Sequence, residues 1–154
     1  MTMTTLDLSD RIERILAIWG TDGSGLPGED AWKALAKCSD IQPVTLVNFF
    51  KMRDFASYPV GLAVGEDGIS GDDAFQRYAA VSMPSLEKVG GRFLLVAPFS
   101  TTFIGAAEDW DLVAIGSYPN PDALLSLFEL KDYREAYHHR TAACRDQKVS
   151  LCIG

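Results

Sequence analysis

The sequence predicts an α+β fold, in which a four-stranded antiparallel sheet of β-α-β-β-α-β order carries its crossover helices on one face. Three observations lead to this fold class. Apolar runs of strand length occupy residues 44–52, 92–99, 110–118 and 148–153. Helical spacing of apolar residues fills the first and the third of the intervals between these runs. Right-handed crossovers through those two intervals produce the ferredoxin-like arrangement.

The chain divides into a helical N-terminal extension, residues 1–42, and the sheet-forming domain, residues 43–154. Ser9 is a suitable N-cap for the first helix of the extension. One side of this helix carries the apolar residues Ile12, Ile15, Leu16 and Trp19. The glycine-rich residues 20–28 end it, and residues 29–37 form a short second helix.

The first strand is mostly apolar on both faces, which is typical of a strand that is covered on both sides. Its period of two places Asn48 on the same face as Leu46 and Phe50. A buried amide without partners costs about 1–3 kcal/mol, so Asn48 needs hydrogen bonds. It is either a structural amide that bonds to neighbouring backbone or a pocket group that orients a ligand.

Residues 53–71 form a long connection with several glycines between the first strand and the first crossover helix. Connections longer than about 12–15 residues are commonly lids, binding loops or mobile segments. The helix that follows begins at Gly71 and places Tyr78 on its inner side. Because proline lacks a backbone donor, Pro84 is expected to bend or interrupt this helix near Met83.

A hairpin connection at residues 100–107 joins the second and third strands. Asn120 and Pro121 then supply an N-cap and a first helical residue for the second crossover helix. A bend at residues 130–132 separates this helix from a second helical stretch, residues 133–146, which contains both histidines.

The composition argues against several classes of partner. The net charge is −7 and no cluster of Lys or Arg offsets it, so nucleic acid is not an expected partner. The start of the chain shows neither a secretion signal nor a membrane span, so we expect no membrane partner and a cytoplasmic location. The three cysteines, an odd number, are expected to be reduced, and none is expected to be a catalytic nucleophile.

The candidate site gathers around the second helical stretch. His139 is a candidate proton carrier, since histidine titrates near neutral pH, and Arg140 is a candidate clamp for an anionic or carbonyl group. Helical spacing places Tyr133 on the same side as Arg140, and we expect Asn48 and Tyr78 to converge with them. The alternative is structural: a histidine that packs against the sheet and an arginine paired with an acidic residue.

No cofactor or metal is expected. The two histidines are adjacent in the sequence, which makes joint ligation of one metal difficult, and there is no H-E-x-x-H motif or cysteine cluster. The glycines of the long connection form no dinucleotide-binding motif either.

Several short motifs carry a family resemblance, and they run from Pro43 to the end of the chain. They are Pro43-Val44, Leu46-Val47-Asn48-Phe49-Phe50-Lys51, Gly90-Gly91-Arg92, Trp110-Asp111, Tyr118-Pro119 and His139-Arg140-Thr141-Ala142-Ala143. In this order and spacing they resemble a bacterial family of unknown function that is related to the DUF1330 group of the dimeric α+β barrel superfamily. The resemblance implies a dimeric ferredoxin-like fold, and it implies no particular substrate or catalytic residue. Cys144 and the longer glycine-bearing connection depart from the family pattern.

Three classes of function follow from these observations. The first is a cofactor-independent enzyme, similar to a monooxygenase or an isomerase, that acts on a small anionic or aromatic metabolite. The second is a small-molecule-binding protein without catalysis, and the third is a purely structural protein. In all three, the face of the sheet that the helices leave open is apolar, so we expect a homodimer with two sheets packed face to face.

Overall fold

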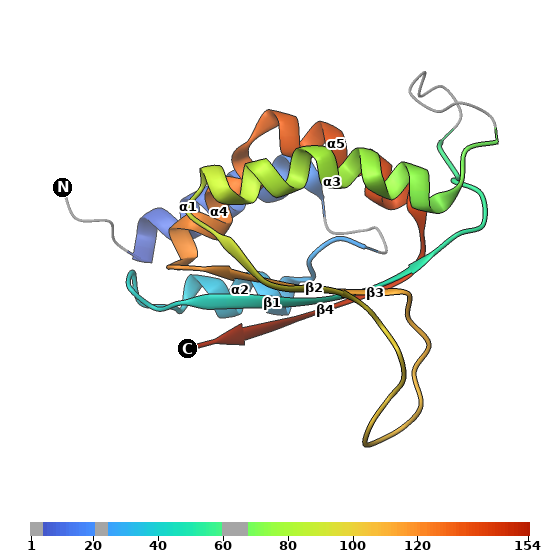
Figure 1. Cartoon of the computed structure of the whole chain (residues 1–154). Helices are drawn as coiled ribbons and strands as arrows, with labels where there is room; N and C mark the ends of the chain where they lie inside the picture. The colour runs from blue at the N-terminus through green and yellow to red at the C-terminus, as the bar shows by residue number, and fades with distance from the viewer. Residues whose placement is uncertain (1–4, 21–24, 60–67) are drawn as a thin grey trace.

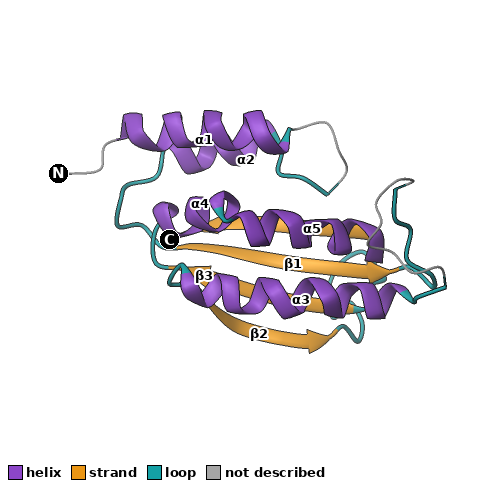
Figure 2. Cartoon of the chain, turned by 90° about the horizontal axis from the view of Figure 1, so that it is seen from above, coloured by secondary structure: helices purple, strands orange, loops and turns teal. Residues whose placement is uncertain are grey.

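The computed structural model describes residues 5–20, 25–59 and 68–154 of the chain (Figure 1). A helical layer lies on one face of a single sheet (Figure 1), and the two N-terminal helices lie to one side, α1 at the height of that layer and α2 at the height of the sheet (Figure 1 and Figure 2). The strands are β1 (Val44–Met52), β2 (Arg92–Pro98), β3 (Leu112–Tyr118) and β4 (Cys144–Ile153). The helices are α1 (Thr5–Trp19), α2 (Glu29–Ala36), α3 (Gly71–Lys88), α4 (Pro121–Glu129) and α5 (Lys131–Ala143).

The sheet has the order β2-β3-β1-β4 and every pair of neighbours is antiparallel. This confirms the predicted fold class, with helices α3 and α5 in the two crossovers. The last strand differs from expectation, because it begins at Cys144 and the preceding helix ends at Ala143. Residues 144–147 pair with the end of β1, so pairing between strands overrides the helical pattern there.

The predicted N-cap of the first helix is wrong, because α1 begins at Thr5 and Ser9 lies inside it. Pro84 does not interrupt α3, which runs from Gly71 to Lys88. The backbone carbonyl that loses its donor belongs to Ala80, and both Ala80 and Pro84 are exposed, so water can supply the missing hydrogen bond. By contrast, Asn120 caps α4 as predicted, since its side chain accepts a hydrogen bond from the backbone of Ala123.

The N-terminal extension is fastened to the helical layer of the domain. The indole nitrogen of Trp19 donates to the carbonyl of Phe128 at 2.9 Å, and Arg11 forms ion pairs with Asp122 and Glu129 of α4. Buried residues Leu8, Ile12 and Ile15 of α1 join the core. The extension is therefore packed as part of the folded unit.

The face of the sheet opposite the helices is open in the described part of the chain (Figure 1). On this face the register places Val47 beside Ile115, and Phe49 beside Val113. The segment between β2 and β3 projects from the sheet on this side as a long arm (Figure 1). Its tip carries Phe103 and Ile104, which are 94% and 89% exposed.

Candidate functional site

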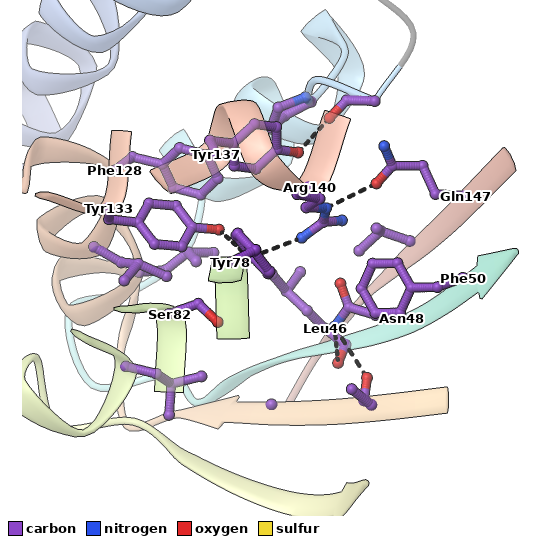
Figure 3. A pocket seen from close by; sticks show the side chains of 18 of the residues that line it. Leu46, Asn48, Phe50, Tyr78, Ser82, Phe128, Tyr133, Tyr137, Arg140 and Gln147 are labelled. Atoms are coloured by element: carbon purple, nitrogen blue, oxygen red, sulfur yellow. Dashed lines mark hydrogen bonds between the residues drawn. The ribbon is translucent and has the colours of Figure 1, made fainter. Parts of the chain in front are cut away.

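A cavity of about 440 Å³ lies between the sheet and the helices (Figure 3). Inward side chains of all four strands form its floor, and α3 and α5 form its roof. Residues of the extension complete one wall, including Leu26, Pro27 and Trp32. The volume falls within the range of about 300–1,000 Å³ that is common for small-molecule sites. We call this cavity the chamber.

Arg140 is the charged side chain in the chamber wall, and it is only 6% exposed. Its Nε donates to Oε1 of Gln147 at 2.9 Å, and its Nη1 donates to the hydroxyl of Tyr78 at 3.1 Å (Figure 3). Its guanidinium carbon lies 4.7 Å from the ring centre of Phe50 and 5.1 Å from that of Tyr137. Among the residues that the structure describes, no carboxylate pairs with Arg140.

Burial and the neighbouring tyrosines act on Arg140 in opposite directions. Burial disfavours the charged guanidinium, but the phenol oxygens of Tyr137, Tyr78 and Tyr133 favour it, and the pKa of Arg140 stands above its ordinary value. Burial has the opposite effect on a phenol: it raises the pKa of Tyr133 and of Tyr137, so both side chains are neutral at neutral pH. The chamber therefore holds a fixed positive charge without a fixed negative one beside it.

Tyr78 and Tyr133 form a hydroxyl pair next to this charge. Their oxygens are 2.9 Å apart, and the oxygen of Tyr78 is shared with Arg140 (Figure 3). Helix α3 supplies Tyr78 and α5 supplies Tyr133, and the two helices pack side by side. The structure thus brings three of the predicted site residues together.

Asn48 also lines the chamber, from the middle of β1. Its side-chain nitrogen donates to the carbonyl of Ala114 at 3.0 Å and lies 3.4 Å from that of Leu46. These bonds are those of a structural amide, and they leave the side-chain oxygen pointing away from the two carbonyls (Figure 3). The structure therefore combines both interpretations of Asn48: a satisfied amide with an acceptor left for the chamber.

His139 does not converge with the other predicted residues, and that expectation is wrong. It is not part of the chamber wall; its Nδ1 lies 2.6 Å from the hydroxyl of Tyr58, in the connection that follows β1. Neighbouring residues on a helix differ in direction by about 100°, so burying Arg140 in the chamber turns His139 aside. Burial, together with the charges of Arg77 and His138, lowers the pKa of His139.

This lowered pKa predicts a pH dependence of stability. Folding favours neutral His139, so its contribution is present above the unfolded pKa of about 6.5 and is lost as pH falls below that value. The free energy of unfolding, measured with urea between pH 7.5 and 5, should decline less in His139→Gln than in the wild type. His138→Gln, at an exposed neighbouring position, removes only the smallest of the three causes and should keep most of the wild-type decline. Equal pH profiles for the wild type and His139→Gln would contradict this.

Three residues that line the chamber, Gln147, Tyr137 and Trp32, were not among the predicted site residues. Gln147 was expected between a helix and a strand, and only the early start of β4 brings it to Arg140. Tyr137 lies three positions before Arg140, a spacing that could have indicated it, and its hydroxyl donates to the carbonyl of Gly25. Trp32 of α2 lines the chamber, and its buried indole nitrogen has no hydrogen-bond partner among the described residues.

The described residues offer little support for other chemistry. They contain no group of three or more His, Cys, Asp or Glu side chains that could hold a metal ion. All three cysteines are free, and burial raises the pKa of Cys144 to about 11, which keeps it a neutral thiol. No helix in the same part of the chain is long and apolar enough to cross a membrane.

Comparisons with known proteins agree with the family resemblance. A family model described as "Domain of unknown function (DUF1330)" matches residues 61–151. The crystal structure of the RPA0582 protein of unknown function from Rhodopseudomonas palustris is similar, with 28% identity and a TM-score of 0.71 over 84% of this chain and 95% of that one. The methylated RPA0582 protein has 28% identity and a TM-score of 0.73 over 86% and 95% of the two chains. No curated protein matches the chain.

Proposed function

This chain belongs to the DUF1330 family, a family of unknown function, and we propose that it binds a small anion with an apolar body in the chamber. One observation carries the proposal: Arg140 is buried in the chamber wall, and no carboxylate among the described residues compensates its charge. A buried charge is costly unless it is paired. A bound carboxylate would pair with it and restore the compensation.

The groups around Arg140 suit a carboxylate in particular. A guanidinium can form two parallel hydrogen bonds with a carboxylate, and such bonds strengthen where water is excluded. The hydrogen bond from Arg140 to Gln147 and the ring of Phe50 hold the guanidinium in place. The oxygen of Asn48 and the hydroxyl of Tyr78 are further polar groups within the same wall.

The direct test compares an acid with its neutral amide of the same shape. We expect 4-phenylbutanoate to bind at least about tenfold more tightly than 4-phenylbutanamide in titration calorimetry, since a charge-assisted hydrogen bond contributes about 1.5–3 kcal/mol. Equal affinity for the two, or no binding of the acid at millimolar concentration, would count against the proposal.

Catalysis is a second candidate function, and the shared hydroxyl of Tyr78 is what favours it. A phenol that accepts a hydrogen bond from Arg140 and contacts Tyr133 is placed to exchange a proton with a bound ligand, without a cofactor. The catalytic role first assigned to His139 would then pass to Tyr78. In Tyr78→Phe, turnover of any identified substrate should be lost while binding is retained.

We further propose that the chain forms a homodimer through the open face of the sheet. Val47, Phe49, Val113 and Ile115 give this face an apolar surface, and exposed apolar patches of this kind commonly mark interaction sites. The exposed tip of the arm lies on the same side (Figure 1) and would add Phe103 and Ile104 to the contact. The free cysteines fit a reducing, cytoplasmic setting.

A further inference from the structure

The floor of the chamber is apolar on the β2 side of the sheet and carries polar side chains on the β1 and β4 side. The register aligns Val96 of β2, Ala114 of β3, Asn48 of β1 and Val149 of β4 in one row across the sheet. A parallel row contains Phe93, Gly116, Leu46 and Leu151. On the β2 and β3 side the two rows contain no polar side chain.

Arg140 lies at the opposite side of this floor. It contacts Phe50 of β1 and Gln147 of β4, which are paired residues of adjacent strands. The roof above β2 and β3 is mostly apolar: α3 contributes Ala79, Met83 and Leu86 to the lining, together with the polar residues Gln76 and Ser82. A ligand held by Arg140 therefore has its polar end near β1 and β4, and the apolar part of the chamber extends from it toward β2.

Ala114 lines the floor on β3, and Leu86 packs over the neighbouring Gly116, where a Cβ atom would approach Cδ1 of Leu86 to 3.2 Å. At the β2 edge the lining residues Met83 and Val96 are 46% and 49% exposed, and at the β4 edge Val149 is 42% exposed. The distance from β1 to β2 is two strand spacings, or roughly 10 Å.

From this asymmetry, and on the premise of the proposed anion binding, we infer that the ligand is a monocarboxylate with an extended apolar chain. Its carboxylate pairs with Arg140, and its chain lies across the strands, over Ala114, toward the β2 edge. Ala114 and Val96 then determine how long a chain the protein accepts, and they do so without touching the carboxylate.

A series of straight-chain acids tests this. In titration calorimetry, the affinity of the wild-type protein should rise about fourfold for each methylene added from hexanoate to decanoate, the equivalent of about 0.8 kcal/mol per buried methylene. In Val96→Trp, the gain should stop at shorter acids because the indole occupies the end of the chamber. Leu95→Trp, on the opposite face of the same strand, should keep the full gain.

Ala114→Leu provides a second variant that fills the chamber from its floor, and it should also shorten the accepted chain. A flat affinity across the series, with Arg140-dependent binding of hexanoate retained, would overturn the inferred chain and leave the anion-binding proposal standing. Absence of Arg140-dependent binding of every acid would overturn both. If Val96→Trp and Leu95→Trp changed the gain in affinity with chain length equally, the inferred course of the ligand chain toward β2 would be wrong.

Discussion

Arg140→Met should abolish the binding of carboxylates by the protein and leave its fold intact but less stable. Methionine keeps much of the length and volume of the arginine stem but removes the buried positive charge and its hydrogen bonds to Gln147 and Tyr78. The fold favours the charged guanidinium, as its raised pKa indicates, so we expect the free energy of unfolding to fall by about 1–3 kcal/mol. Affinity for 4-phenylbutanoate should fall roughly a hundredfold or more, because two charge-assisted hydrogen bonds are lost.

Two companion variants complete this experiment. Arg140→Lys keeps the charge but lacks the planar fork, so it should recover only part of the affinity. Arg145→Met removes a positive charge from an exposed position outside the chamber wall and should change neither stability nor binding. If Arg140→Met keeps the wild-type affinity for 4-phenylbutanoate, the arginine serves only the core, and its contacts with Phe50, Tyr78 and Tyr137 are structural.

Val47→Asp should convert the homodimer into a monomer. Val47 lies in the centre of the open face, opposite Ile115, and a carboxylate there would be buried without a partner in a face-to-face dimer. The cost of such a charge is several kcal/mol, enough to raise the dissociation constant by roughly a thousandfold or more. Light scattering coupled to size exclusion at micromolar concentration measures the outcome.

Ala80→Asp is the matched control, because it places the same charge on the exposed side of α3, away from the open face. It should leave the dimer intact. A monomeric wild-type protein, or a dimer that persists in Val47→Asp, would show that the open face is not the interface. The pair Phe103→Ser and Ile104→Ser would then test whether the arm alone holds two copies together.

The sequence was sufficient to predict the sheet and much of the chamber wall. The period of two in β1 predicted that Asn48 shares the inward face with Phe50, and the structure places both in the wall. Helical spacing predicted that Tyr133 and Arg140 lie on one side of a helix, and they do. These inferences depend only on local periodicity, which the folded chain preserves.

The parts that could not be predicted depend on contacts between distant segments. The pattern of residues 144–146 predicts a continuation of the helix, but these residues pair with β1, and Gln147 reaches Arg140 only through that pairing. His139 and Arg140 are adjacent on the helix, so only one of them can point into the chamber. Local spacing does not determine which one does. The residues of α2 give no sign in the sequence that they border a cavity in the neighbouring domain.

The wall contributed by the N-terminal extension lies outside residues 61–151, the segment that defines the family. Gly25 touches the site through its carbonyl, which accepts from Tyr137, and a Cβ atom at Gly25 would come within 2.4 Å of the side chain of Gln147. The lining of the chamber thus joins residues of the segment that matches the family model with residues that precede it, among them Trp32 of α2 and Asn48 of β1.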